Sequence, residues 1–300
     1  MAVLQAETDL RKGKPRYVVM SMQRNLTATE LGNMVRQVVF RPEESMIKNS
    51  SRLQTVLPLN VRLQNHALRF NSGAIAYRGQ FPWQAAIVID DSSFCGGALI
   101  SNYWVLTAAH CRGNTYYVRL GANRLDIQEY GSLDVTGRYM ETYPGYNPTL
   151  LLNDIAVIRL SQCVQFTSYI APARLPNRLQ QSETFAGETL RVSGWGIISD
   201  SGSGVSPDLA YSDIIGITNY DCTRFYGKAI TPSKLCATAF NDDTTCHGDA
   251  GGPLVFFDRG GYYILVGIVS FGSKSGCQFG NPVAFSRVTS FLTWIKPYAI

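Results

Sequence analysis

The sequence predicts an all-β fold for most of the chain. From Gly79 almost to the C-terminus, short runs of β-branched and aromatic residues alternate with Gly, Asn, Asp and Pro, which is the pattern of short strands joined by turns. The chain has 300 residues and is 45% apolar, so it can bury a full hydrophobic core. The spacing of the runs favours a β-barrel or a β-sandwich over helices packed on a sheet.

The expected strands coincide with these short apolar runs. Outside the N-terminal segment, a helix is expected only near the end of the chain, over residues 289–295, where Pro297 would break it. The runs that predict strands are 85–89, 95–100, 104–107, 116–120, 155–160, 190–193, 254–257 and 262–271.

Residues 1–69 carry the basic excess of the chain. They hold 11 Lys/Arg and 5 Asp/Glu, a net charge of +6, whereas residues 70–300 hold 16 and 17, a net charge of −1. A solvated arm explains this excess better than a specific anion-binding arm, and no nucleic-acid partner is expected. Thr27 and Glu30 have capping-box spacing, and apolar residues recur at helical spacing as far as Val39. We therefore expect a partly helical pro-segment.

Cysteine usage favours a disulfide framework. All seven cysteines follow residue 90 and none shows CxxC spacing, so a zinc site is disfavoured and an oxidising compartment is indicated. Glycosylation acceptor patterns at Asn25 and Asn49 add mild support for secretion. No apolar run is long enough to span a bilayer, and residues 1–17 contain no signal-peptide core. We expect a secreted, extracellular protein whose signal has been removed or lies outside this sequence.

The stretch 246–253 (CHGDAGGP) is the most unusual in the chain. Three glycines closed by a proline predict a tight loop whose backbone amides are free to hold an anion. Ala250 lies at the centre of this loop, where a nucleophile would be expected. Any chemistry assigned to this loop therefore has to proceed without that hydroxyl.

His110 and Asp154 are candidates for a hydrogen-bonded pair. The chain contains three histidines, His66, His110 and His247, so candidates for a general base are few, and His110 directly follows an apolar strand. Asp154 leads into a run that is apolar on both faces, and a buried carboxylate needs a donor. Taken alone, each residue could equally be a hydrogen-bonded strand-end histidine or an ordinary turn aspartate.

Three motifs together resemble the trypsin/chymotrypsin family of serine endopeptidases. They are residues 107–111 (TAAHC), 154–156 (DIA) and 248–253 (GDAGGP), in that order, and residues 81–84 (FPWQ) resemble arthropod members. The resemblance covers about residues 70–300 and implies two six-stranded antiparallel β-barrels with a C-terminal helix. It places the N-terminal barrel at about 70–172 and the C-terminal barrel at about 173–300, after the pro-segment 1–69.

The resemblance also implies roles for individual residues. His110 would be the general base, Asp154 would orient it, and Ser270 would support that carboxylate. Gly248 and Ala250 would supply backbone N–H groups to an oxyanion hole. The attacking hydroxyl is absent at Ala250, and loss of a triad nucleophile costs about 10⁶ in turnover.

A disulfide pattern follows from the same resemblance. Cys163 has no family partner, and residues 1–69 contain no cysteine that could tether the pro-segment. The implied pairs are Cys95 with Cys111, Cys222 with Cys236, and Cys246 with Cys277.

The family's specificity pocket maps onto Thr244, Ser270, Gly272 and Val283. Trypsin-like members carry an aspartate where this chain has Thr244, so recognition of Lys or Arg is not expected. Gly272 keeps one wall open and Val283 narrows the base, which predicts an apolar preference at the P1 position. Thr244 could equally be a turn residue in a pocket that binds nothing.

Activation in the family requires cleavage after a basic residue. The junction here is Arg69–Phe70, and the new amine would pair with Asp249. Phe70 replaces a branched aliphatic residue, and overpacking a fitted site costs about 1–3 kcal/mol, which places normal activation by another protease in doubt. No calcium is expected at residues 121–124, which lack an acidic ligand at the first position, and no cofactor is expected.

Two functional hypotheses follow. The first is a non-catalytic homologue that binds peptides or proteins and regulates, consistent with Phe70, Ser72 and Ala250. The second is a serine endopeptidase zymogen whose nucleophile was replaced, consistent with the intact His110 and Asp154. Under both, the edge near residues 270–272 could accept an extended peptide by strand addition, and we expect the basic pro-segment to mask that cleft.

Overall fold

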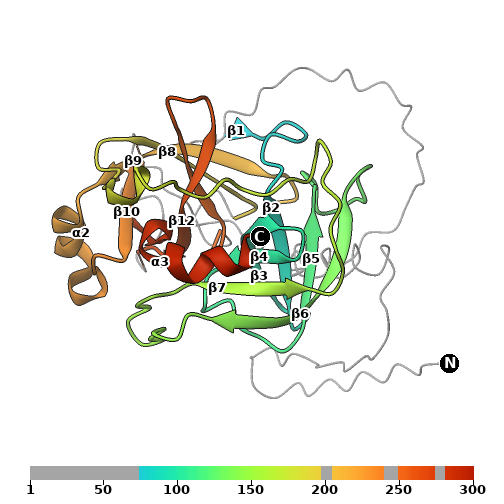
Figure 1. The fold of residues 1–300 in the computed structure, drawn as a ribbon, viewed down its shortest axis with the longest axis horizontal. Coiled ribbons are helices and arrows are strands. Elements are labelled where there is room, and N and C mark those ends of the chain that lie inside the picture. The colour runs from blue at the N-terminus through green and yellow to red at the C-terminus, as the bar shows by residue number, and fades with distance from the viewer. Residues whose placement is uncertain (1–73, 197–204, 240–248, 274–280) are drawn as a thin grey trace, which may run out of the picture.

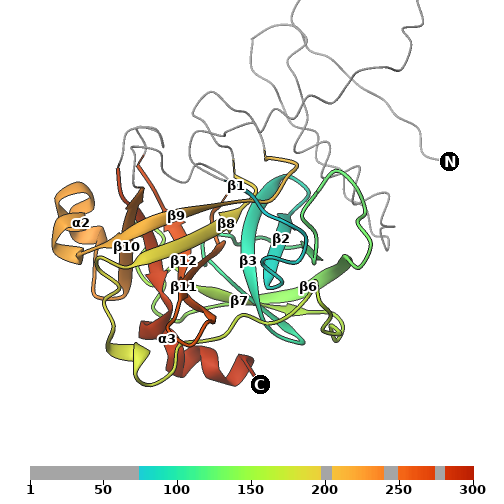
Figure 2. The ribbon, with the colours of Figure 1, turned by 90° about the horizontal axis from the view of Figure 1, so that it is seen from above.

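The computed structural model describes residues 74–196, 205–239, 249–273 and 281–300. These residues form two β-barrels that lie side by side, with blue-to-green strands in one and yellow-to-red strands in the other (Figures 1 and 2). The predicted N-terminal helix and linker, and residues Arg69, Phe70, Thr244 and Gly248, lie outside the described residues. So does the implied pair Cys246 and Cys277.

The first barrel is closed by six antiparallel strands in the order β2-β3-β4-β7-β6-β5. Every residue of β2 (QAAIVI) is buried, because residues 85–89 pack into the core and the strand is paired on both edges, with β3 and with β5. The strands are β2 Gln84–Ile89, β3 Ser93–Ser101, β4 Trp104–Thr107, β5 Tyr116–Leu120, β6 Leu133–Thr142 and β7 Ala156–Leu160.

The second barrel contains six antiparallel strands in the order β9-β10-β13-β12-β11-β8, and pairing of β8 with β9 closes it. A short strand, β1 (Ala74–Ile75), adds to the outer edge of β9. The barrel strands are β8 Thr189–Gly194, β9 Ala210–Ile217, β10 Lys234–Ala239, β11 Pro253–Phe257, β12 Tyr263–Phe271 and β13 Val283–Arg287.

The predicted C-terminal helix is present as α3 (Val288–Ile295), and it ends before Pro297 as expected. The chain continues through a 3₁₀ turn, η3 (Lys296–Tyr298), because a proline is tolerated in the first turn of such a segment. The Tyr298 ring then packs against Trp104 of the first barrel, with ring centroids 4.7 Å apart. The end of the second barrel is thereby attached to the first.

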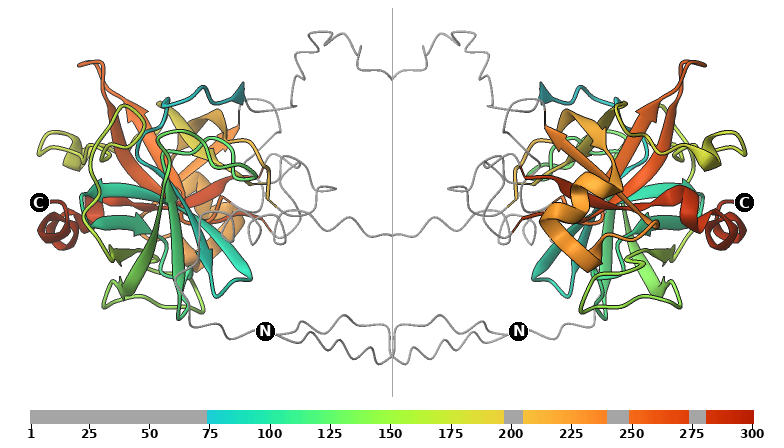
Figure 3. Two further views of the ribbon diagram at one scale, coloured as in Figure 1. Left: turned by 90° about the vertical axis from the view of Figure 1, so that its right-hand side faces the viewer. Right: turned by 90° about the vertical axis from the view of Figure 1, so that its left-hand side faces the viewer.

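One helix was not expected from the sequence. α2 (Asn219–Tyr226) is two turns long and lies on the outside of the second barrel, where Figure 3 shows it in orange. Its N-terminus is capped by Thr218, whose hydroxyl accepts from the Asp221 N–H at 3.1 Å. Two further 3₁₀ turns are η1 (Gln180–Ser182) and η2 (Gly227–Ala229).

The hydrophobic core is continuous across the two barrels. One buried cluster combines first-barrel residues such as Leu99 and Ile158 with Trp195, Ile268 and Ile295 from the second half of the chain. A second cluster fills the interior of the C-terminal barrel. The barrels are therefore fixed against each other, and residues at their junction keep a defined geometry. The architecture confirms the expected fold of two six-stranded barrels with a C-terminal helix.

Candidate active site

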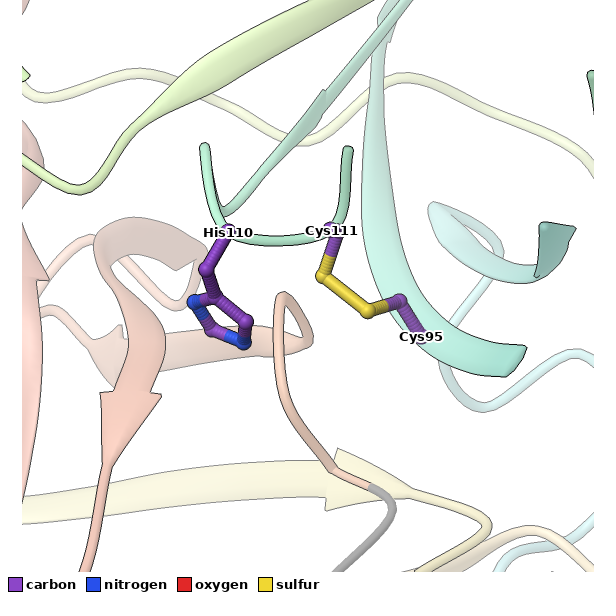
Figure 4. A group of neighbouring side chains, drawn as sticks. All are labelled: Cys95, His110 and Cys111. Carbon is purple, nitrogen blue, oxygen red and sulfur yellow. A yellow bond between two sulfur atoms is a disulfide. The ribbon is translucent and has the colours of Figure 1, made fainter. Parts of the chain in front are cut away.

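His110 lies in a turn directly after β4. Ala108 and Ala109 are fully buried, and a disulfide joins Cys111 to Cys95 on the neighbouring strand β3. Figure 4 shows the imidazole and the disulfide side by side on this turn. Small residues and a covalent cross-link therefore set the position of the ring.

Asp154 holds the imidazole at the junction of the barrels. Its carboxylate is completely buried, whereas the His110 side chain is 27% exposed. His110 donates twice to it, from Nδ1 to Oδ2 at 2.7 Å and from the backbone N–H to Oδ1 at 2.9 Å. An ionised carboxylate only accepts hydrogen bonds, so the Nδ1 proton faces Asp154 and Nε2 is left as the acceptor nitrogen.

The second barrel completes the surroundings of Asp154. Ser270 donates from Oγ to Oδ2 at 2.6 Å, and Ser286 donates to the Asp154 carbonyl at 2.6 Å. Burial alone would raise the pKa of Asp154, but the hydrogen bonds and charge of His110, the Ser270 hydroxyl and the charge of Lys234 together lower it below its ordinary value. Asp154 is therefore ionised at neutral pH.

Lys234 is a residue that sequence reasoning missed. It begins β10, is fully buried, and donates from Nζ to Ser270 Oγ at 2.8 Å. In the sequence it precedes an apolar strand, where a lysine usually marks the solvated end of the strand. No sequence signal shows that its side chain turns inward to Ser270, because that hydrogen bond joins residues 36 positions apart.

The glycine-rich loop docks against β3, beside the His110 turn. Gly96 donates its N–H to the Ala250 carbonyl at 2.8 Å, and that carbonyl oxygen lies 3.9 Å from Cys111 Sγ. Gly251 has φ +79° and would collide with Thr107 if it carried a side chain, so glycine is required there. The structure thus brings Ala250 next to the His110–Cys111 turn. The assignment of oxyanion-hole donors stays a prediction.

Of the predicted pocket residues, the structure places Ser270, Gly272 and Val283 together. Ser270 lies near the end of β12, Gly272 directly follows that strand, and Val283 begins the adjacent strand β13. Val283 is buried, whereas Gly272 is exposed and has open space on its side-chain face, with Val283 at its edge. This arrangement fits a wall that is open to a ligand side chain. The role of these residues as a pocket is not tested by the geometry alone.

Asp249 precedes the loop centre, and its carboxylate is enclosed by backbone. It accepts a hydrogen bond from the Gly196 N–H at 3.0 Å, and a methyl group at Gly194 or Gly196 would overlap it. Burial raises the pKa of Asp249 to about 7, against the opposing effect of the Gly196 hydrogen bond. Among the residues that the structure describes, no cation pairs with this carboxylate.

The described residues offer one cluster with metal-ligand atoms, Cys95, His110 and Cys111. It does not fit a metal ion, because the two sulfurs are bonded to each other and cannot act as thiolates. In addition, His110 Nδ1 is engaged by Asp154. The sulfur and nitrogen atoms are close only because the disulfide and the histidine share a turn.

The Arg78 guanidinium lies against residues 121–124, the segment at which no calcium is expected. Arg78 donates to the carbonyls of Gly121 and Tyr130 and lies 3.5 Å from the Glu129 carboxylate. Glu129 also accepts from the Asn123 and Arg124 amides. The absence of calcium at this loop stays a prediction. The positive charge of Arg78 at the same place is consistent with it.

Two of the implied disulfides are present, Cys95–Cys111 and Cys222–Cys236. Within the described residues, Cys163 is exposed and carries a free thiol. None of the helices in the described ranges is long and apolar enough to cross a membrane.

Comparison with known proteins defines the class. The sequence matches the family model described as Trypsin over residues 70–295. It is 40% identical over 226 residues to brachyurin from Leptuca pugilator, which covers 75% of this chain and 96% of that protein. It is 37% identical over 235 residues to a collagenase from Hypoderma lineatum, with coverages of 76% and 86%.

Solved structures agree with the sequence matches. The fold is similar to that of HL collagenase, with a TM-score of 0.67 and 36% identity over 75% of this chain and 96% of that one. It is also similar to mouse neuropsin, a serine protease, with a TM-score of 0.68 and 31% identity over 76% and 99% of the two chains. The double barrel is that of a chymotrypsin-like serine protease. The chain belongs to the trypsin family.

Proposed function

We propose that this protein is a secreted, non-catalytic member of the trypsin family that binds peptides or proteins at the junction of its barrels. The observation that carries the proposal is Ala250, which occupies the nucleophile position of the glycine-rich loop and has no hydroxyl. A methyl group cannot attack a carbonyl, whereas the backbone of the loop keeps its N–H groups. Binding of an extended ligand can therefore persist without cleavage.

The aromatic residue at the processing junction supports the same function. Cleavage after Arg69 by another protease would leave Phe70 as the new terminus. Its ring is larger than the aliphatic side chain that the family buries beside the equivalent of Asp249, and such overpacking costs about 1–3 kcal/mol. If the Phe70 amine does not pair with Asp249, a nucleophile at residue 250 would have no activated site in which to act.

One alternative has a specific observation in its favour. The hydrogen bonds that join His110, Asp154 and Ser270 are complete, at 2.7 and 2.6 Å. This is the arrangement that a general base requires, and a protein that only binds does not depend on it. The alternative is a serine endopeptidase zymogen with apolar P1 preference that carries an inactivating change at residue 250.

Ligand binding tests the proposal directly. Labelled peptides with Leu, Phe or Arg at P1, together with a collagen-derived peptide because one relative is named a collagenase, are titrated into the protein before and after cleavage at Arg69. We expect tighter binding of the Leu and Phe peptides than of the Arg peptide, measured by fluorescence anisotropy. Mass spectrometry should recover the peptides uncut.

The matched control is a substitution that fills the open side of the predicted pocket. Gly272→Phe places a ring where Gly272 leaves open space beside Val283, and we expect at least about tenfold weaker binding, or ~1.4 kcal/mol. Equal binding by the wild-type protein and this variant, or preference for the Arg peptide, would show that the predicted pocket is not the binding site.

A further inference from the structure

The side chain of Lys234 lies in the second barrel behind the carboxylate that holds His110. It is completely buried, and the backbone of Lys234 makes three hydrogen bonds. Its N–H donates to the Thr231 carbonyl at 2.9 Å, and its carbonyl accepts from Asn219 Nδ2 at 3.0 Å and from Arg287 Nε at 3.1 Å. These hydrogen bonds therefore fix the backbone position from which the side chain extends into the barrel junction.

The hydrogen bonds from this amine run in one direction. Lys234 Nζ lies 2.8 Å from Ser270 Oγ, and Ser270 Oγ lies 2.6 Å from Asp154 Oδ2. An ammonium group only donates, so the Ser270 oxygen accepts from Lys234 and its own proton points to Asp154. Asp154 Oδ2 then accepts from both Ser270 and His110 Nδ1.

The positive charge of Lys234 and the negative charge of Asp154 also favour each other. Burial lowers the pKa of Lys234 to about 8, although the charge of Asp154 favours the protonated amine. The Phe271 ring lies 5.2 Å from Nζ and adds no charge. The described titratable or charged groups around these contacts are Asp154, His110, Arg287, Tyr226 on α2, which packs against Phe271, and Tyr146, whose pKa is raised by burial and by Asp154.

We propose that Lys234 is a positioning residue for the His110–Asp154 pair, which fixes the Ser270 proton on Asp154 and offsets the negative charge that the carboxylate presents to the imidazole. With the ammonium in place, Asp154 stabilises an imidazolium less strongly. Without it, the carboxylate acts on His110 with its full charge. This role does not depend on a hydroxyl at residue 250, so it stands or falls independently of the proposed function.

Titration of His110 by NMR in the full-length protein tests this role. Lys234→Met keeps the unbranched stem and removes the charge and the donors. We expect the midpoint of the His110 imidazole titration to move upward by about one pH unit, the order of shift that a neighbouring charge produces. The signal is assigned with His110→Gln, and Lys296→Met, which removes an exposed charge from η3, is expected to leave the midpoint unchanged.

The wild-type protein provides a second readout if Lys234→Met does not fold. As Lys234 loses its proton, the His110 resonances should show a further inflection near pH 8, with the Cys163 thiol alkylated so that its titration does not contribute. A folded Lys234→Met protein with an unchanged midpoint would overturn the proposal. So would a wild-type curve with no second inflection between pH 7 and 10.

Discussion

The imidazole of His110 donates from Nδ1 to a buried carboxylate, which leaves Nε2 as the nitrogen that can accept a proton. In a catalytic relative this nitrogen would take the proton of the attacking hydroxyl. Here the adjacent loop presents Ala250 instead. At the scale of single residues, the protein holds His110 in a defined orientation, and under our proposal it lacks the group on which this base would act.

Asp249 makes the stability of the uncleaved protein depend on pH. Its pKa is raised from 3.8 to about 7 in the folded state, so the folded protein binds the proton more tightly than the unfolded chain does. The contribution of Asp249 to the free energy of unfolding should therefore be largest below about pH 4, fall as pH rises, and level off above pH 7, opposite in sign to the contribution of Asp154, whose pKa is lowered. Denaturant unfolding at pH 4, 5, 6 and 8 measures this.

The control for that prediction is Asp249→Asn, which removes the titrating group and keeps the acceptor for the Gly196 N–H. The difference in unfolding free energy between wild type and variant should change over the same pH interval. A constant difference from pH 4 to pH 8 would show that Asp249 does not titrate in this range.

The pH dependence also reports on activation. If cleavage at Arg69 placed the Phe70 amine beside Asp249, the ion pair would hold the carboxylate ionised and remove the loss of stability toward neutral pH. We expect the cleaved protein to keep the dependence, because the Phe70 ring hinders entry of the terminus.

At the scale of secondary-structure elements, strands were predictable where nearly every residue is buried, as in β2 and β4, because short runs rich in apolar and β-branched residues between turn residues favour strands. β6 was not among the expected strands, because only Val135 of its ten residues is buried and its polar pattern resembles a loop. α2 was missed because two turns are too short to show helical periodicity. The inward turn of Lys234 has no local signal, since tertiary contacts alone determine it.

The cap of α2 gives a prediction at this scale. Thr218→Ala removes the hydroxyl that accepts from the Asp221 N–H, and we expect it to lower the free energy of unfolding by about 1 kcal/mol. Thr223→Ala on the same helix is the matched control. Thr223 bonds back to the Asn219 carbonyl, a contact that does little for helix stability. Equal effects of the two substitutions in denaturant unfolding would show that the cap does not stabilise α2.

At the scale of the whole molecule, the site exists only where the two barrels meet. His110 and Asp154 come from the first barrel, whereas Ser270, Ser286 and Lys234 come from the second. The order of the sequence motifs was enough to predict that these halves form a family site. It could not predict the inter-barrel contacts themselves, because they depend on how the shared core sets the orientation of the barrels.

The central claim is that this member of the trypsin family binds without cleaving. Its most direct test is hydrolysis of Leu and Phe P1 peptides by Ala250→Ser after verified cleavage at Arg69, with the wild-type protein and the Ala250→Ser/His110→Ala double variant as controls. The account predicts that all three proteins bind the peptides and that Ala250→Ser turns them over no faster than the controls, because the Phe70 terminus fails to pair with Asp249 even when the hydroxyl is restored. Turnover by Ala250→Ser at the rate of an active family member, lost in the double variant, would contradict it and establish the protein as a protease zymogen with a replaced nucleophile.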